Sequence, residues 1–224
     1  MKRPLSQLIY TRVQEGEGSP RVITLHKHNQ HARDVADYGT AVAPTGRVTG
    51  LESYKGVFIG WNIVGYTWFI GPFEQPSPLY FGDALAEIER FLWDEVDRQE
   101  GGQAELPFLV GVEQGAIMAI AAAAAVPDLL SGVIAIDGFL PMVPGWDPPL
   151  APLEGLPILL IDPVDEPDRG QSVLGGETLV STLRAWGGDV TRLVAPAEPV
   201  PAGAMAEWMR ARAPRFLAPV AASQ

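Results

Sequence analysis

The chain has 224 residues, of which 47% are hydrophobic and 19% charged, and its formal net charge is −11. This length and composition are typical of one compact globular domain, so we expect a single domain over residues 1–224. The negative charge argues against binding to nucleic acid or to an anionic membrane surface. The absence of cysteine excludes disulfides, thiol nucleophiles and thiolate metal sites.

The N-terminal stretch "MKRPLSQLIYTRVQEGEGSP" has no apolar run long enough for a signal peptide. No segment approaches the roughly 20 apolar residues that a membrane span needs. We therefore expect a cytoplasmic protein that has no membrane partner.

Apolar runs rich in β-branched residues alternate with helical patterns along the chain. The runs predict strands at 21–25, 46–51, 107–112, 132–136, 156–161 and 189–194. Residues 53–78 are rich in glycine, proline and aromatic residues, and we expect them to form a long structured loop. Helical spacing predicts helices at 81–98, capped by Asp83, and at 114–125, 177–186 and 203–213. Continuous apolar strands that alternate with helices form a parallel sheet covered on both faces, so the predicted class is α/β, doubly wound.

One segment, "PFLVGVEQGAIMAIAAAAA" at 107–125, has the pattern of a nucleophile elbow. A buried strand enters a tight turn between Gly111 and Gly115, and an alanine-rich helix follows. Enzymes with this turn display a serine between the two glycines, because the sharp turn exposes its hydroxyl. Here the displayed residue is Glu113.

Several stretches resemble the carboxylesterase/phospholipase branch of the α/β-hydrolase superfamily. They are "GYTWF", "GVEQGAIMA", "GVIAIDGFLP", "LPILLIDPVDEP" and "LVSTLRAWGGDVTRLVAPAEPVP", in the family's order. The resemblance covers nearly the whole chain, from residue 22 to about residue 212. It implies an α/β-hydrolase fold, with a mostly parallel sheet and helices on both faces.

The resemblance also implies that the catalytic triad is degenerate. Glu113 stands where the family has its serine, and Glu166 stands where it has the acid. The family's histidine aligns with Ala197. Triad chemistry needs a hydroxyl, a base that accepts its proton and an acid that orients the base. A conventional serine esterase mechanism is therefore not expected.

The oxyanion loop is altered as well. The family's His-Gly-x-Gly-Gly pattern appears here as "HKHNQH", without the glycines that let backbone amides turn toward a substrate. The resemblance places His28 in this loop, across from the elbow, and leaves the backbone N–H of Gln114 as the surviving oxyanion donor.

Three interpretations of Glu113 remain open. It could act with His28 or His31 as an acid/base pair or a nucleophile on a small ester or lactone. His26, His28, His31 and Glu113 are also metal-ligand types, although a histidine-rich surface turn explains the same spacing, and we expect neither metal nor cofactor. Alternatively the chain is a pseudoenzyme that binds a ligand or partner, and Glu113 only caps its helix. The sequence leaves open whether the protein is an enzyme.

Two groups of aromatic and apolar residues fall in segments that border the pocket of the resembled family. They are Trp61, Tyr66, Trp68 and Phe69 before the elbow, and Phe139 and Met142 after it. They predict a site for a small apolar molecule, with packing beneath the loops as the alternative. Members of the family often pair, so a homodimer is a further expectation from the resemblance.

Overall fold

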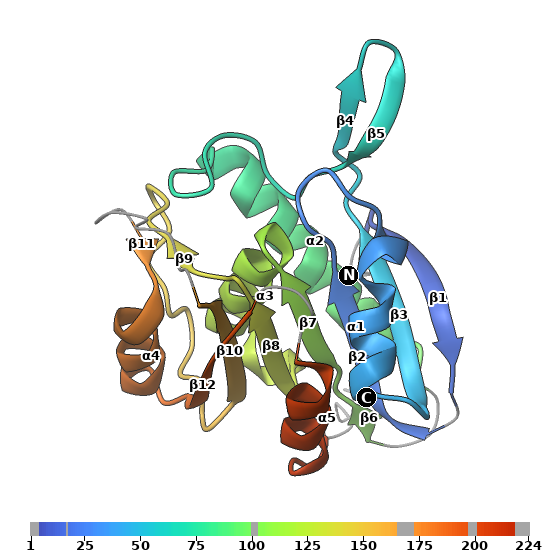
Figure 1. Ribbon diagram of the computed structural model, residues 1–224, viewed down its shortest axis with the longest axis vertical. Coiled ribbons are helices and arrows are strands. Elements are labelled where there is room, and N and C mark those ends of the chain that lie inside the picture. The colour runs from blue at the N-terminus through green and yellow to red at the C-terminus, as the bar shows by residue number, and fades with distance from the viewer. Residues whose placement is uncertain (1–4, 17, 100–102, 165–172, 197–200, 218–224) are drawn as a thin grey trace, which may run out of the picture.

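The computed structural model describes residues 5–16, 18–99, 103–164, 173–196 and 201–217. Its centre is a seven-stranded sheet in the order β1-β3-β2-β7-β8-β10-β12 (Figure 1). Only the edge strand β1 runs antiparallel to its neighbour, and all other pairs in this sheet are parallel. The strands are β1 (Ile9–Glu15), β2 (Gly18–Leu25), β3 (Gly46–Glu52), β7 (Phe108–Val112), β8 (Gly132–Ile136), β10 (Pro157–Pro163) and β12 (Asp189–Ala195).

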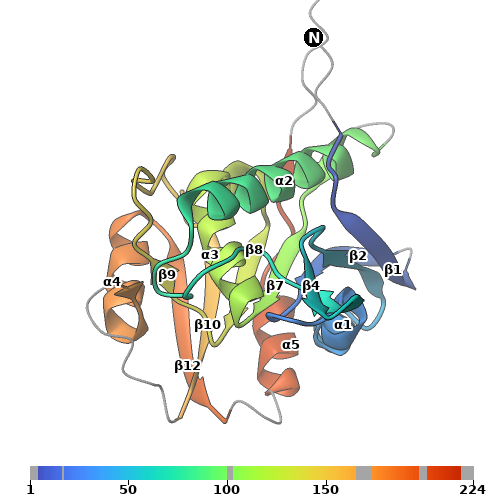
Figure 2. The ribbon, with the colours of Figure 1, turned by 90° about the horizontal axis from the view of Figure 1, so that it is seen from above.

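Helices cover both faces of the sheet, as Figure 2 shows from above. One face packs against α2 (Pro78–Asp97), α3 (Gln114–Ala125) and α4 (Gly176–Ala185). The other packs against α1 (Ala36–Val42), which follows the short turn η1 (Ala32–Val35), and against α5 (Ala202–Arg210). Helix α3 lies between the sheet and α2 and is buried from its first residue to Ala124, which is why its sequence is apolar on every side. The predicted doubly wound α/β class is confirmed.

The remaining elements are short. Strands β4 (Gly56–Ile59) and β5 (Asn62–Tyr66) form a hairpin. Strand β9 (Leu140–Pro141) pairs with β11 (Val173–Leu174), and β6 (Ala104–Glu105) pairs with β13 (Phe216–Leu217). A single 3-10 turn, η2 (Pro127–Leu129), follows α3. Within the described residues, none of the helices combines the length and the apolarity that crossing a membrane requires.

Two predictions about the region before the elbow are wrong. The stretch expected to be a long loop contains the β4–β5 hairpin, because glycines at both ends of a short apolar run concealed its alternation. Asp83 does not cap the following helix, which begins at Pro78 after Ser77. The proline fits the first helical turn because it has no N–H to satisfy. The Asp83 carboxylate instead accepts a hydrogen bond from the Tyr54 hydroxyl.

Candidate functional site

The elbow lies between β7 and α3, and its backbone is strained. Glu113 has φ 53° and ψ −112°, backbone angles that residues other than glycine rarely adopt. Its N–H donates to the carbonyl of Ile136 at 2.8 Å, which fixes the turn against the neighbouring strand β8. A Cβ on Gly111 would lie 2.2 Å from the Gly115 carbonyl oxygen, and one on Gly115 would lie 2.2 Å from the Leu25 carbonyl oxygen. Both glycines are therefore required for the turn to pack this closely.

The Glu113 side chain does not cap its own helix, because it makes no hydrogen bond to the amides of the first turn of α3. Its Oε2 instead accepts a hydrogen bond from the backbone N–H of His28, at 3.1 Å. His28 lies in the loop after β2, at the position where the family resemblance expects an oxyanion donor. The His28 N–H is therefore already hydrogen-bonded to the Glu113 carboxylate.

The His28 ring is held by Thr67, and the other contacts of the Thr67 hydroxyl determine which ring nitrogen donates to it. Nδ1 of His28 lies 3.0 Å from Thr67 Oγ1, which also lies 2.9 Å from Gln114 Oε1 and 2.8 Å from the carbonyl of Phe69. Those two oxygens can only accept, so the single hydroxyl proton of Thr67 goes to one of them. Nδ1 must then donate to Thr67, and Nε2 is the unprotonated nitrogen of the neutral ring.

Gln114 is fully buried, and its side-chain amide holds the aromatic segment against the elbow. Its Oε1 accepts from the N–H of Trp68 at 2.7 Å, and its Nε2 donates to the carbonyl of Phe69 at 3.0 Å. Thr67 completes this cluster, although the sequence alone does not predict its role. A threonine beside two aromatic residues gives no signal until the loop is known to lie on the elbow.

His26 is a structural residue of the core. Ser53 donates its backbone N–H to Nε2 at 3.2 Å, so Nδ1 carries the proton and donates to the carbonyl of Lys27 at 2.7 Å. The ring stacks on Trp68 with centroids 4.8 Å apart. Burial lowers the pKa of His26 to about 4. With both nitrogens engaged inside the protein, this histidine has no free position for a metal.

His31 belongs to a separate cluster. Its Nδ1 lies 3.0 Å from Glu52 Oε2, its backbone N–H donates to Asp34 Oδ2 at 2.8 Å, and its ring meets that of Tyr66 edge-on. The carboxylate that this imidazole contacts is thus Glu52 and not Glu113. Over the described part of the chain, no three His, Asp or Glu side chains gather as a metal site would require.

The predicted pocket residues fall into three environments. Trp61 is 99% exposed at the tip of the β4–β5 hairpin, and Tyr66 lies at the base of that hairpin. Trp68, Phe69 and Phe139 are almost completely buried, so they pack beneath the loops. The structure does not bring Trp61 to the elbow.

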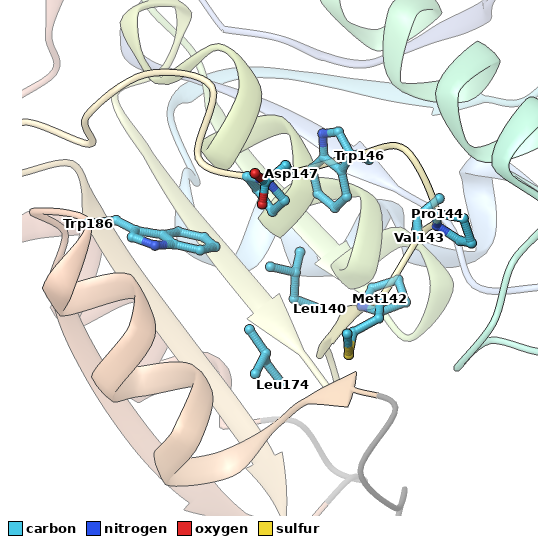
Figure 3. A pocket seen from close by; sticks show the side chains of 10 residues that line it. Leu140, Met142, Val143, Pro144, Trp146, Asp147, Leu174 and Trp186 are labelled. Atoms are coloured by element: carbon cyan, nitrogen blue, oxygen red, sulfur yellow. The ribbon is translucent and has the colours of Figure 1, made fainter.

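Met142 is the remaining predicted pocket residue, and it lines an open cavity of about 340 Å³. Such a volume lies within the usual range for small-molecule sites. The wall is mostly apolar, and Figure 3 shows Trp146 and Trp186 on opposite sides of it. The other lining residues are Leu140, Pro141, Val143, Pro144, Asp147, Pro148 and Leu174. The loop that follows β8 therefore supplies most of this cavity.

Two positions of the expected triad, Glu166 and Ala197, lie outside the described residues. The strand ends that lead to them are described. Asp162, near the end of β10, is buried and forms an ion pair with Arg192 of β12. Asp137 repeats the geometry of the elbow one strand further on, with φ 53° and its N–H donated to the carbonyl of Ile161 at 2.8 Å.

The chain is similar in sequence to the putative esterase NocK of Nocardia uniformis subsp. tsuyamanensis. The two are 26% identical over an alignment of 194 residues, and the match covers 79% of this chain and 54% of NocK. This chain thus spans about half the length of that relative. No family model matches the sequence.

Solved carboxylesterases share the architecture. The carboxylesterase of Bacillus cereus superposes with a TM-score of 0.71 at 16% identity, covering 92% of each chain. That of Mesorhizobium loti superposes with a TM-score of 0.70 at 17% identity, covering 87% of this chain and 90% of that one. The chain therefore has the α/β-hydrolase fold that the resemblance implies, in an arrangement shared with these two carboxylesterases.

Proposed function

We propose that this chain is a carboxylesterase-like protein without the Ser-His-Asp triad, and that it binds a small apolar ester- or lactone-like molecule without hydrolysing it. The observation that carries the proposal is the hydrogen bond from the His28 N–H to Glu113 Oε2. In serine hydrolases such an amide stabilises the negative oxygen that develops on the substrate. Here the His28 N–H already donates to the Glu113 carboxylate. The negative charge of that carboxylate would repel a negative oxygen that develops on a substrate at the same place.

The ligand site that we propose is the cavity lined by Leu140, Met142, Trp146 and Trp186. Apolar walls with few polar groups are typical of sites for small apolar molecules. The similarity to NocK, which carries the name of a putative esterase, supports an ester-like ligand.

One observation favours a second candidate function, in which Glu113 and His28 perform acid/base chemistry. The Thr67 contact leaves Nε2 of His28 as the nitrogen able to accept a proton. The backbone N–H of the same residue donates to the Glu113 carboxylate, so an imidazole and a carboxyl group belong to two residues in direct contact. Such a pair could add water to an ester or open a lactone.

Hydrolysis of p-nitrophenyl butyrate separates the two candidates. We expect the wild type to release no more p-nitrophenolate than Glu113→Gln or His28→Gln. Glu154→Gln is the matched control, because Glu154 is an exposed glutamate that also has a positive φ, of 46°. Release that is lost in Glu113→Gln and His28→Gln, yet kept in Glu154→Gln, would establish the acid/base function and overturn the binding proposal.

Binding is measured with ethyl butyrate, followed by the fluorescence of the tryptophans that line the cavity. We expect saturable quenching in the wild type and at least about tenfold weaker binding in Met142→Glu, because a carboxylate in the apolar wall must be desolvated. Leu150→Glu is the control, since Leu150 is equally exposed in the same loop (62% against 63%) but does not line the cavity. Equal binding by the two variants would remove the ligand from this cavity.

A further inference from the structure

The β4–β5 hairpin projects from the body of the molecule, as Figure 1 shows at the top of the view. Its tip exposes three large apolar side chains: Phe58 is 60% exposed, Ile59 is 69% exposed and Trp61 is 99% exposed. Large apolar side chains that are exposed together mark a surface that meets another protein or a membrane. Neither the cavity nor the elbow accounts for this group, because it lies on a different element.

The apolar side chains surround the tip and do not line a single face of it. Phe58 pairs with Ile63 across the two strands. Ile59 follows Phe58 directly, and it lies on the other face because successive residues of a strand point to opposite faces. Trp61 completes the group in the turn between the strands. A partner protein would cover one face of such a hairpin and leave the other in water, whereas a lipid layer surrounds the whole tip.

The hairpin also differs from the rest of the chain in its charge. Residues 56–73 contain no Asp, Glu, Lys or Arg, although the chain as a whole has a net charge of −11. A charged side chain is costly to transfer into lipid, so a segment that enters lipid is expected to carry none. The indole of Trp61 has an apolar body and a polar N–H, which suit the boundary between headgroups and acyl chains. The negative charge of the body opposes anionic lipid, so the partner that fits is a lipid surface without net charge.

The length and the backbone of the hairpin limit how deeply the tip enters. The four residues of β4 span about 13 Å at about 3.3 Å per residue, and interfacial elements enter a bilayer to a depth of about 5–10 Å. On its outer side β4 has no strand neighbour within the described part of the chain. Unpaired N–H and C=O groups cannot enter the hydrocarbon core, so the tip stops near the headgroups, where water still reaches its backbone.

We propose that residues 58–63 dock this protein on a lipid surface of no net charge, such as phosphatidylcholine. The proposal revises the expectation of no membrane partner, which rests on the net charge and on the lack of a spanning segment. Neither opposes a small uncharged tip that lies in a neutral surface without crossing it. In Figure 1 the hairpin extends beyond the end of the sheet at which β7 meets α3. A docked chain therefore turns the elbow toward the lipid.

Co-sedimentation of the full chain with sucrose-loaded phosphatidylcholine vesicles tests the docking. We expect the wild type to bind, and Ile59→Glu and Ile59→Lys each to lower the partition coefficient at least about tenfold, because a charge of either sign must be desolvated. Replacing part of the lipid with phosphatidylglycerol should weaken wild-type binding, since the body is acidic.

Leu150→Glu is the matched control, because it makes the same charge change at a side chain that is 62% exposed. The Leu150 N–H donates to the carbonyl of Ala124 in the last turn of α3. Leu150 therefore lies at the end of this helix that is remote from the elbow, and its variant should bind vesicles as the wild type does.

Entry of the tip itself is measured with phosphatidylcholine that is brominated on its acyl chains, which quenches the fluorescence of tryptophans that reach them. We expect quenching in the wild type and much less in Trp61→Phe. This variant should still sediment with the vesicles, because phenylalanine keeps most of the apolar area.

Several outcomes would overturn the proposal. A wild type that stays in the supernatant at every lipid concentration excludes lipid, and self-association of that protein, lost in both Ile59 variants, would assign the tip to a protein partner. Binding that either Ile59 variant retains, or that Leu150→Glu loses, would place the lipid contact elsewhere, as would equal quenching in the wild type and Trp61→Phe. Circular dichroism confirms that each variant is folded. The inference is independent of the proposed function, because it involves neither Glu113 nor the cavity.

Discussion

Two halves of one uncharged segment behave in opposite ways. In residues 56–73 there is no Asp, Glu, Lys or Arg. The first half stands out from the body as the β4–β5 hairpin, with Trp61 fully exposed, whereas Trp68 and Phe69 in the second half are among the most buried side chains. Composition alone does not separate them.

The difference comes from the polar groups with which each half of the segment forms hydrogen bonds. The buried amide of Gln114 provides partners for the N–H of Trp68 and the carbonyl of Phe69, and the carbonyl of His26 accepts from the Trp68 indole N–H at 2.9 Å. Backbone groups can be buried at low cost only when they are paired in this way. Among the described residues, the hairpin is hydrogen-bonded to the body at its base, where Tyr66 pairs with Asn29 and Gln30, and its tip stays in water. Stability should therefore depend strongly on the elbow and weakly on the hairpin.

The largest effect is expected from a methyl group added at the elbow. Gly115→Ala places a Cβ 2.2 Å from the Leu25 carbonyl oxygen, so β2 and α3 must move apart, and we expect a loss of at least about 3 kcal/mol in the free energy of unfolding. Gly60→Ala in the hairpin turn meets no atom within 4 Å and bears only the strain of φ 62°, about 1 kcal/mol. Urea unfolding of both variants measures the contrast. Equal losses would contradict it.

The next effect is a dependence on pH through His26. Its pKa is about 4 in the folded protein, against 6.5 for an unperturbed imidazole, so the unfolded chain binds more protons between these values. The stabilisation is complete above pH 6.5 and is lost as pH falls toward 4, by about 3 kcal/mol in all. The loss in this window should be smaller in His26→Gln. An identical pH profile in the two proteins would refute the assignment.

A smaller loss is expected when the amide that holds the aromatic segment is removed. Gln114→Met has a similar volume but leaves the N–H of Trp68 unpaired in the core, and the carbonyl of Phe69 then keeps only the hydroxyl of Thr67 as a partner. We expect about 2 kcal/mol of destabilisation, with the emission of the buried tryptophan shifted to the red. Thermal unfolding followed by fluorescence measures both quantities. A variant as stable as the wild type would mean that the amide does not hold this segment.

The smallest effect is expected at the hairpin tip. Trp61→Ser removes the most exposed large hydrophobic side chain of the described residues and should change the free energy of unfolding by less than about 0.5 kcal/mol. Chemical denaturation of the variant and of the wild type checks this. A loss comparable to that of Gln114→Met would show that the tip packs against the body after all.

Most of the fold could be predicted from the sequence, because the buried strands and helices have a clear periodicity. The bounds predicted for β8 and α3 agree with the structure. The edge strand β1 is not predicted, because it has no continuous apolar run and four of its seven residues are exposed. The sequence indicates a loop in place of the hairpin for a similar reason, since no core face constrains the alternation of its residues.

The candidate site was predictable only in part. The shape of the elbow and the identity of Glu113 follow from the spacing of Gly111 and Gly115, because close packing requires both glycines. The contact of Glu113 with the His28 amide, rather than with an imidazole, depends on side-chain rotamers that no sequence pattern encodes. The sequence also could not separate the three histidines. One is buried, one contacts Thr67 and one contacts Glu52, and each environment is set by segments distant in sequence.

The most direct test of this account is the hydrogen exchange of the His28 amide, measured by NMR in the wild type and in Glu113→Ala. If the Glu113 carboxylate holds this amide, the variant should exchange at least about tenfold faster at His28, while Glu154→Ala leaves the rate unchanged. Exchange at the same rate in all three proteins would contradict the account. It would mean that the amide is not engaged by Glu113 and is free to stabilise an oxyanion.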